Sequence, residues 1–152
     1  MEQEDRFQLG IKAWLLDDKS NLLLLKVNTL LGGYDEEPYW DIPGGRIHVN
    51  ETIKDTLSRE VLEETNLSIK SFEFFHAALS SLRLSLEDGT TVGLVLFIYK
   101  CEFKNDRTIE LSDEHTEYRW FPPGQAGELL RVKYPEDFVN RLVDIGPAKD
   151  MT

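Results

Sequence analysis

The 152-residue sequence contains one cysteine, Cys101, which excludes a disulfide bond within the chain and is typical of a reducing compartment. Its first ten residues lack the basic and apolar regions of a secretory signal peptide. No apolar run approaches the ~20 residues that a membrane-spanning helix needs. We therefore expect a cytoplasmic protein with no membrane partner, in which Cys101 is a small core residue rather than a nucleophile.

Positive charge is also scarce. Lysine and arginine number 17 against 28 aspartates and glutamates, which gives a formal net charge of −11. Proteins that bind a nucleic-acid polymer need a basic surface, so we expect no such partner. An anionic small molecule would be repelled as well, unless a bound metal ion reversed the local sign. The length fits a single domain, 1–152, with enough interior for a core.

The first half of the chain shows two β-type patterns. Residues 7–16 alternate in a way that predicts a strand, with Ile11, Ala13 and their apolar neighbours on one face and Lys12 and Trp14 on the other. Residues 22–27 form a nearly unbroken apolar run, as expected of a strand buried on both faces. Because a short polar turn separates the two runs, they predict a β-hairpin.

Further strands are expected over residues 68–79 and 80–86, followed by an Asp-Gly turn. Residues 91–103 form the longest β-type run, and we expect the central strand there. Pro135 can begin the last helix. The apolar face of that helix would pack on the sheet through Phe138, Val139, Leu142 and Val143.

A helix that begins at Thr52 breaks its own packing pattern. Thr52 and Asp55 have the spacing of a capping box. One stripe of this helix carries two apolar residues and then two acids: Ile53, Leu57, Glu60 and Glu64. A half-buried carboxylate costs free energy unless it is paired or bound to a metal. On this pattern alone, a functional site and a solvated, charged helix end are equally good interpretations.

The acids at the end of this helix have neighbours on the same surface. Glu60 lies three and four positions before Glu63 and Glu64, so the three carboxylates converge on one turn. A hard divalent cation would offset their repulsion, because Mg²⁺ prefers oxygen ligands. The three histidines, by contrast, do not have zinc-ligand spacing: His48, His76 and His115.

The segment from Gly45 to Leu67 resembles the signature of the Nudix hydrolases. That signature reads G, five residues, E, seven residues, REU, one residue, EE, one residue, GU, where U is a bulky aliphatic residue. The matching positions are Gly45, Glu51, Arg59, Glu60, Val61, Glu63, Glu64 and Leu67. Asn66 replaces the family's second glycine, at a helix end where asparagine is the next best residue for a left-handed backbone.

The resemblance implies an α/β fold, the α/β/α sandwich with a mixed central β-sheet. It also implies hydrolysis of a diphosphate linkage in a nucleoside diphosphate joined to another moiety. The metal would be Mg²⁺, with Mn²⁺ as the alternative. By the same resemblance, it would be held by Gly45, Glu60, Glu63 and Glu64.

The resemblance implies catalytic roles too. One glutamate, Glu64 or Glu114, would act as general base, and the family does not fix which one. Glu114 is the best match to an acid that faces the signature helix from the loop before the last strand, with Glu117 as the runner-up. Arg59 would orient a glutamate through a bidentate pair, and Glu51 lies within reach of the same cluster.

Substrate contacts are expected near the glycine pair. Gly44, Gly45 and Arg46 would shape the phosphate-binding end. Trp40 or Tyr39 could stack on a base or belong to the core. Residues 28–38 form either a lid or specificity loop or a plain surface connection.

We expect a nucleoside triphosphate pyrophosphohydrolase first, because the chain is compact and has no added domain. The stretch from Glu114 to Trp120 resembles dinucleoside polyphosphate hydrolases, which are one alternative; ADP-ribose or nucleotide-sugar hydrolases are another. A non-catalytic, nucleotide-binding regulator with the same fold is the alternative outside the enzymes, although such modules usually lack the signature acids. The family includes monomers and homodimers, and both stay open here.

Overall fold

The computed structural model describes residues 3–32 and 37–145. These residues form strands, one 3₁₀ turn and α-helices in the following order. They are β1 (Phe7–Leu15), β2 (Leu22–Val27), η1 (Thr29–Gly32), β3 (Trp40–Asp41), β4 (Gly44–Arg46), α1 (Ile53–Thr65), β5 (Ile69–Leu79), β6 (Leu84–Ser85), β7 (Thr91–Phe103), β8 (His115–Phe121), α2 (Pro123–Leu130) and α3 (Glu136–Ile145).

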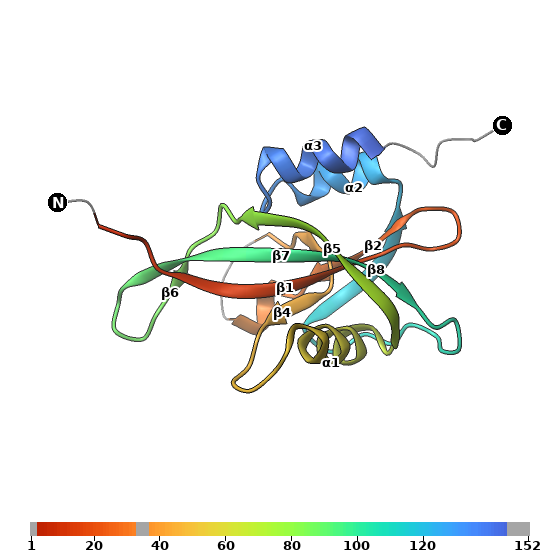
Figure 1. Cartoon of the computed structure of the whole chain (residues 1–152), viewed down its shortest axis with the longest axis horizontal. Helices are drawn as coiled ribbons and strands as arrows, with labels where there is room; N and C mark the ends of the chain where they lie inside the picture. Colours follow the sequence, from red (N-terminus) through yellow and green to blue (C-terminus); the bar gives the residue numbers. More distant parts are fainter. Residues whose placement is uncertain (1–2, 33–36, 146–152) are drawn as a thin grey trace.

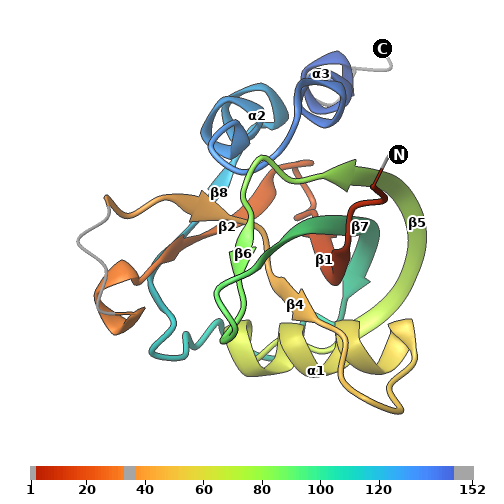
Figure 2. The ribbon, with the colours of Figure 1, turned by 90° about the vertical axis from the view of Figure 1, so that its left-hand side faces the viewer.

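Two β-sheets lie between the helices. The larger has the strand order β4-β1-β7-β5, with β6 also paired to β7, and it is mixed because β1 and β7 run parallel while its other pairs are antiparallel. The smaller sheet, β3-β2-β8, is antiparallel. Helix α1 covers one side of the sheets, and α2 and α3 cover the other (Figures 1 and 2). The expected sandwich is confirmed, and β7 is the central strand.

The predicted hairpin between the first two strands is confirmed only at its turn, where the Asp17 N–H donates to the Asn21 carbonyl at 3.0 Å. β1 and β2 belong to different sheets, and an isolated bridge between Leu16 and Leu22 joins them where the turn begins. β1 pairs instead with β7 and β4, while β2 pairs with β8 and β3. A short turn brings two strands together at one end, but their apolar faces decide which partners they take along their length.

The alternation in β1 does not separate a buried face from an exposed one, since Lys12 and Trp14 are both buried, at 5% and 2% exposure. The reason is that helices cover both faces of the sheet, so β1 contributes to two separate cores. Trp14 belongs to the core beneath α2 and α3, and its neighbour Leu15 belongs to the core beneath α1. In residues 80–86, the expected strand is limited to Leu84–Ser85.

Helix α1 begins and ends as its sequence predicts. The Thr52 hydroxyl accepts a hydrogen bond from the Asp55 N–H at 3.1 Å, and the Asp55 carboxylate accepts one from the Thr52 N–H at 3.0 Å. Asn66 ends the helix in the left-handed region, with φ of 68°, and its N–H donates to the Leu62 carbonyl. Its side chain also donates to the Thr108 carbonyl at 3.1 Å, which ties the helix end to the following loop.

The C-terminal helices close the other side of the sheets. Pro135 directly precedes α3, and Phe138, Val139 and Leu142 are buried as expected, whereas Val143 is 43% exposed. No helix within 3–32 or 37–145 is long and apolar enough to cross a membrane. Part of the proposed lid, residues 33–36, and the chain after residue 145 lie outside the described residues.

Candidate active site

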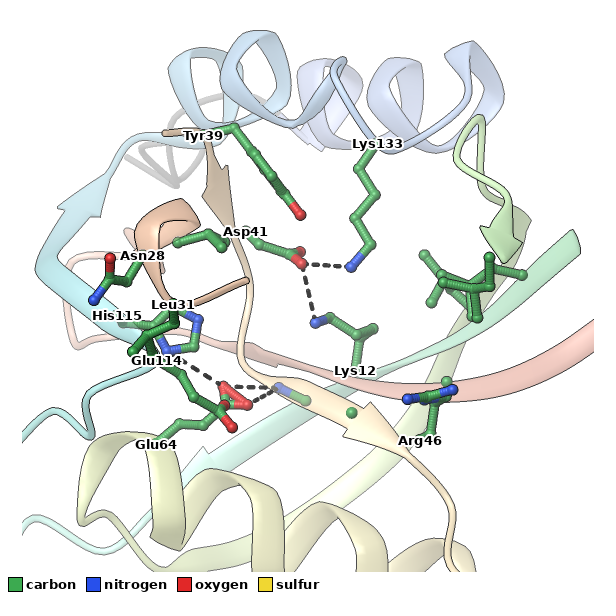
Figure 3. Close-up of a pocket in the computed structure, with 17 residues that line it drawn as sticks. Lys12, Asn28, Leu31, Tyr39, Asp41, Arg46, Glu64, Glu114, His115 and Lys133 are labelled. Carbon is green, nitrogen blue, oxygen red and sulfur yellow. Dashed lines mark hydrogen bonds and ion pairs between the residues drawn. The ribbon is translucent and has the colours of Figure 1, made fainter. Parts of the chain in front are cut away.

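A cavity of about 390 Å³ opens between α1 on one side and the segment that joins α2 to α3 on the other (Figure 3). Its wall includes the glycine pair of β4, the Glu64 side chain of α1 and the Glu114-His115 pair at the start of β8. Several residues that the sequence predicted at the site therefore line the same cavity. The residues that line it are Gly10, Lys12, Val27, Asn28, Leu31, Tyr39, Asp41, Gly44, Gly45, Arg46, Glu64, Leu84, Leu94, Leu96, Glu114, His115 and Lys133.

The two glycines of β4 are required by close contacts. A Cβ atom on Gly45 would lie 2.4 Å from Oε1 of Glu60, so any side chain there would displace that carboxylate. Gly44 has φ of +144°, and a Cβ would lie 2.2 Å from the Ile11 carbonyl oxygen. The absence of side chains lets β4 lie directly against the acidic end of α1. The N–H of Gly44 points at Glu64, 3.4 Å from Oε1.

Arg59 organises the glutamates around it. Its guanidinium donates two hydrogen bonds to Glu51, of 2.7 and 2.9 Å, in a bidentate pair. It also donates to Oε1 of Glu60 at 2.7 Å and reaches Glu63 at 3.5 Å. The Arg59 hydrogen bonds hold the pKa of Glu51 down at about 2, against the opposing effect of burial. Arg59 thus fixes Glu60 beside Gly45, while the side chain of Glu63 stays 59% exposed.

Glu64 is the buried acid of the helix, at 3% exposure. Burial raises its pKa to about 9; the Lys12 charge opposes this rise and the Glu60 charge adds to it. Nδ1 of His115 lies 3.9 Å from Oε2 of Glu64. Burial lowers the pKa of His115 to about 4, so this imidazole is neutral at pH 7. Its Nδ1 has no hydrogen-bond partner among the described residues.

Glu114 lines the cavity from the loop before β8. Its pKa is raised, first by partial burial and then by the charges of Glu60, Asp113 and Glu63. Glu117, the runner-up, is outside the cavity lining and accepts a hydrogen bond from Arg119 at 2.6 Å.

The structure separates the two candidate stacking residues. Tyr39 lines the cavity, whereas Trp40 does not. Trp40 packs edge-on against Phe121, with ring centroids 5.2 Å apart, at the margin of the core. Arg46 lines the cavity from β4. Cys101 is buried, and burial raises the pKa of its thiol to about 12, which disfavours a nucleophilic role.

The acids of α1 fit a hard cation in their chemistry but are not arranged as a finished metal cage. Within residues 3–32 and 37–145, no three acidic, histidine or cysteine side chains lie close enough together to hold an ion. Glu60 and Glu64 nevertheless face β4 from one helical turn, and Glu64 carries a carboxylate that burial makes costly to ionise alone. An oxygen-ligated cation would offset that cost.

Sequence reasoning missed one polar cluster in the cavity wall. The buried carboxylate of Asp41 accepts hydrogen bonds from Lys12 at 3.2 Å and Lys133 at 2.7 Å (Figure 3). It also accepts one from the Tyr134 hydroxyl at 2.6 Å. A lysine between Ile11 and Ala13 was a signal that could have been used, because it interrupts an apolar stretch. Lys133, in a polar segment, gave no such signal.

Comparison with known proteins places this geometry in a family. A family model described as the NUDIX domain matches residues 6–142. A MutT-like protein of Streptomyces ambofaciens is 27% identical over 110 residues, which are 71% of this chain and 64% of that protein. The chain therefore spans less than two thirds of the length of this relative.

Solved structures are similar over nearly the whole chain. The MutT protein of Methanosarcina mazei Go1 is 23% identical, with 94% of this chain and 97% of that chain covered and a TM-score of 0.64. A MutT NUDIX hydrolase of Burkholderia pseudomallei is 19% identical, with 93% and 99% covered and a TM-score of 0.65. An Ap4A hydrolase of C. elegans is 18% identical, with 92% and 94% covered and a TM-score of 0.59.

These structural likenesses, at low identity, show a shared fold rather than a shared substrate. The family match rests on the sequence itself and extends from the start of β1 to the buried part of α3. The chain belongs to the NUDIX domain family, whose members are typically divalent-metal-dependent pyrophosphohydrolases.

Proposed function

We propose that this protein hydrolyses a diphosphate linkage in a nucleoside diphosphate derivative, with Mg²⁺ or Mn²⁺ as its cofactor. The observation that carries the proposal is the contact between β4 and the acidic end of α1. There, Gly45 leaves room for Glu60, Arg59 holds that carboxylate, and Glu64 is buried at the wall of the cavity.

Glu60, Glu63 and Glu64, with the backbone of Gly45, are the groups that would hold the metal. When bound, the ion would neutralise charge on the phosphoryl oxygens and lower the pKa of a bound water. Arg59 keeps Glu60 in place through its bonds to Glu51 and Glu60. Arg46, Gly44 and Tyr39 contribute to the wall that would orient the substrate.

The general base is Glu64 or Glu114. Glu64 is positioned by the Gly44 N–H and by burial, so it has a fixed geometry. Glu114 is more exposed and lies just before β8, and the charges of the α1 acids Glu60 and Glu63 act on it. Substitution of each by glutamine, followed by comparison of the pH profiles of kcat at saturating Mg²⁺, separates the two roles, because loss of the base removes the acidic limb of the profile.

The first candidate substrate is a nucleoside triphosphate, cleaved to a monophosphate and pyrophosphate. A dinucleoside polyphosphate, ADP-ribose or a nucleotide sugar is the second candidate. The cavity volume of about 390 Å³ is within the range of small-molecule sites, roughly 300–1,000 Å³. The likeness to an Ap4A hydrolase keeps the dinucleoside class in the test panel.

The test is a panel assay. The protein is incubated with Mg²⁺ or Mn²⁺ and with nucleoside triphosphates, ADP-ribose, nucleotide sugars and dinucleoside polyphosphates, and the products are separated by ion-exchange chromatography. Cleavage of one class is the expected result. If no compound is cleaved and calorimetry shows no binding of Mg²⁺, the enzyme proposal is wrong. The protein would then be a non-catalytic module.

Glu63→Gln tests the metal assignment. Because the side chain is 59% exposed and its partner Arg59 has other bonds, we expect an intact fold. We expect activity to fall by about 100-fold or more, since loss of groups that merely support a metal site already costs 10–100-fold. Glu73→Gln, at an exposed position of β5, is the matched control. A Glu63→Gln enzyme with nearly normal kcat would show that the assignment is wrong.

A further inference from the structure

The cluster around Asp41 brings two lysines to the cavity from different elements. Lys12 comes from β1, and Lys133 comes from the segment between α2 and α3, on the side of the cavity away from α1 (Figure 3). Both ammonium groups bond the same oxygen, Oδ2 of Asp41, at 3.2 and 2.7 Å. The two nitrogens are therefore within about 6 Å of each other by this geometry, close enough to share one ligand group.

In this cluster both oxygens of Asp41 already accept hydrogen bonds, whereas the two lysine ammonium groups keep N–H donors that are not used. Oδ1 of Asp41 accepts from the Tyr134 hydroxyl at 2.6 Å and from the Ile42 N–H at 2.8 Å, and Oδ2 accepts from both lysines. Each ammonium has three N–H groups, and each makes one of these bonds. Neither ammonium group makes another hydrogen bond to a described residue. The wall therefore offers donors to the cavity.

The charges of the cluster do not cancel. Burial alone would raise the pKa of Asp41, but the charges of Lys12 and Lys133 outweigh it and hold this pKa well below the usual value. Asp41 is thus ionised. Burial lowers the pKa of Lys12, whereas the Asp41 charge opposes this and favours its ammonium form. Counted formally, the two ammonium groups and the one carboxylate of this cluster leave one surplus positive charge, in a wall that also contains Leu94 and Leu96. An anionic ligand group would offset this charge, whereas a neutral group would not.

We propose that Lys12 and Lys133 bind the oxygens of a substrate phosphoryl group from the side opposite to the carboxylates of α1. This inference rests on the proposed function and adds the anchoring residues for the substrate's anionic part. Asp41 is a positioning residue, since its contacts hold both ammonium groups at the cavity. Lysine also recognises the acceptor edge of guanine, but a neutral base would leave the surplus charge uncompensated.

Lys133→Met is the variant of choice, because Asp41 then keeps Lys12 and Tyr134 as partners. Lys133→Arg preserves the charge. Lys70→Met, at an exposed position of β5, removes the same charge away from the cavity and is the matched control. Circular dichroism and thermal denaturation check the fold of each variant.

The binding experiment uses methylenediphosphonate, a diphosphate analogue that is not hydrolysed, titrated calorimetrically in the presence of Mg²⁺. We expect its affinity to fall about tenfold in Lys133→Met, the size expected for one lost charged hydrogen bond. The affinity should be unchanged in Lys70→Met and largely retained in Lys133→Arg. Equal affinity in wild type and Lys133→Met, or equal losses in both methionine variants, would overturn the proposal.

A second measurement needs no variant that could misfold. In wild-type protein with ¹³C-labelled lysine, methylenediphosphonate should shift the Cε resonances of Lys12 and Lys133 but not that of Lys70. Absence of these shifts at saturation overturns the proposal. If Lys133→Met lost guanosine binding while methylenediphosphonate binding stayed unchanged, the two lysines would bind the nucleobase of the substrate. This result would also overturn the proposal.

These outcomes are independent of turnover. If the substrate panel shows no cleavage but the analogue binds as expected, the proposed function fails and the anchoring role stands. If cleavage occurs while both KM and analogue affinity are normal in Lys133→Met, the anchoring role fails and the proposed function stands.

Discussion

At the scale of single residues, the site depends on the absence of a side chain at Gly45. Its place against Oε1 of Glu60 leaves no space for a methyl group. Gly45→Ala should therefore displace the Glu60 carboxylate from the position that Arg59 gives it. We expect Mg²⁺ affinity to fall by about tenfold or more, as when a supporting contact of a metal site is lost. Calorimetric titration with Mg²⁺ measures the effect.

Gly124→Ala is the control for this change. A Cβ at Gly124 would meet nothing within 4 Å, and the residue lies at the start of α2, away from the acids. Its Mg²⁺ affinity should equal that of the wild type. Unchanged affinity in Gly45→Ala would mean that the position of Glu60 does not matter to metal binding.

Asp41 gives a prediction about pH. Its pKa in the folded protein is held below the ordinary value of 3.8, so its contribution to stability is present above that value and is lost as the pH falls. Asp41→Asn lacks this contribution. At pH 7 we expect the variant to be less stable by about 3 kcal/mol, the scale for breaking a buried ion pair.

The difference between wild type and Asp41→Asn should shrink as the pH is lowered from about 5 to 3. Urea denaturation at several pH values measures it. A difference that stays constant over this interval would contradict the assignment of Asp41 as the ionised centre of the cluster.

At the scale of elements, α1 depends on its ends to hold the acids in place. Thr52→Ala removes the hydroxyl that accepts from the Asp55 N–H, and should lower the free energy of unfolding by about 1 kcal/mol. Thr52→Ser keeps the hydroxyl and should stay near the wild type. Urea denaturation compares the three proteins, and equal losses in both variants would assign the effect to the threonine methyl group instead.

The sequence predicted α1 well because the determinants of this helix are local. Its capping box and its left-handed end at Asn66 each involve residues a few positions apart. The pairing of β1 and β2 could not be predicted in this way, since it depends on β7 and β8, which are distant in the sequence. Local alternation also could not show that helices cover both faces of β1.

The same contrast applies to the site. The acids of α1 were placed on one helical turn by their spacing, and the glycine pair was expected beside them from the resemblance to the Nudix signature. Lys12, Asp41 and Lys133 meet only because three separate segments pack together, and Asp41 and Lys133 are 92 positions apart in the sequence. Glu114 was expected from a resemblance, and the structure places it at the cavity, whereas its role stays a prediction.

At the scale of the whole molecule, metal binding should stabilise the fold, because the ion binds the arrangement of α1 and β4 found only in the folded chain. With Mg²⁺ at about 100 times its dissociation constant, we expect the melting temperature to rise on the order of 5 °C. Excess EDTA should reverse the rise.

Glu60→Gln should abolish this rise, and Glu73→Gln should retain it. Differential scanning calorimetry with and without Mg²⁺ measures both. A rise of the same size in Glu60→Gln would show that the ion binds elsewhere on this acidic protein, whose formal net charge is −11.

The bonds of Asp41 to Lys133 and Tyr134 constrain how the chain can be recombined with relatives. A chimaera joined at Pro122, before α2, would replace Lys133 and Tyr134 by residues of the other parent, while Lys12 and the Asp41 carboxylate stayed behind. Unless the donor supplied equivalent groups, a buried carboxylate would lose two of its three side-chain partners. The C-terminal helices therefore cannot be exchanged between relatives by themselves. A chimaera that folds should take β3 and these helices from the same parent.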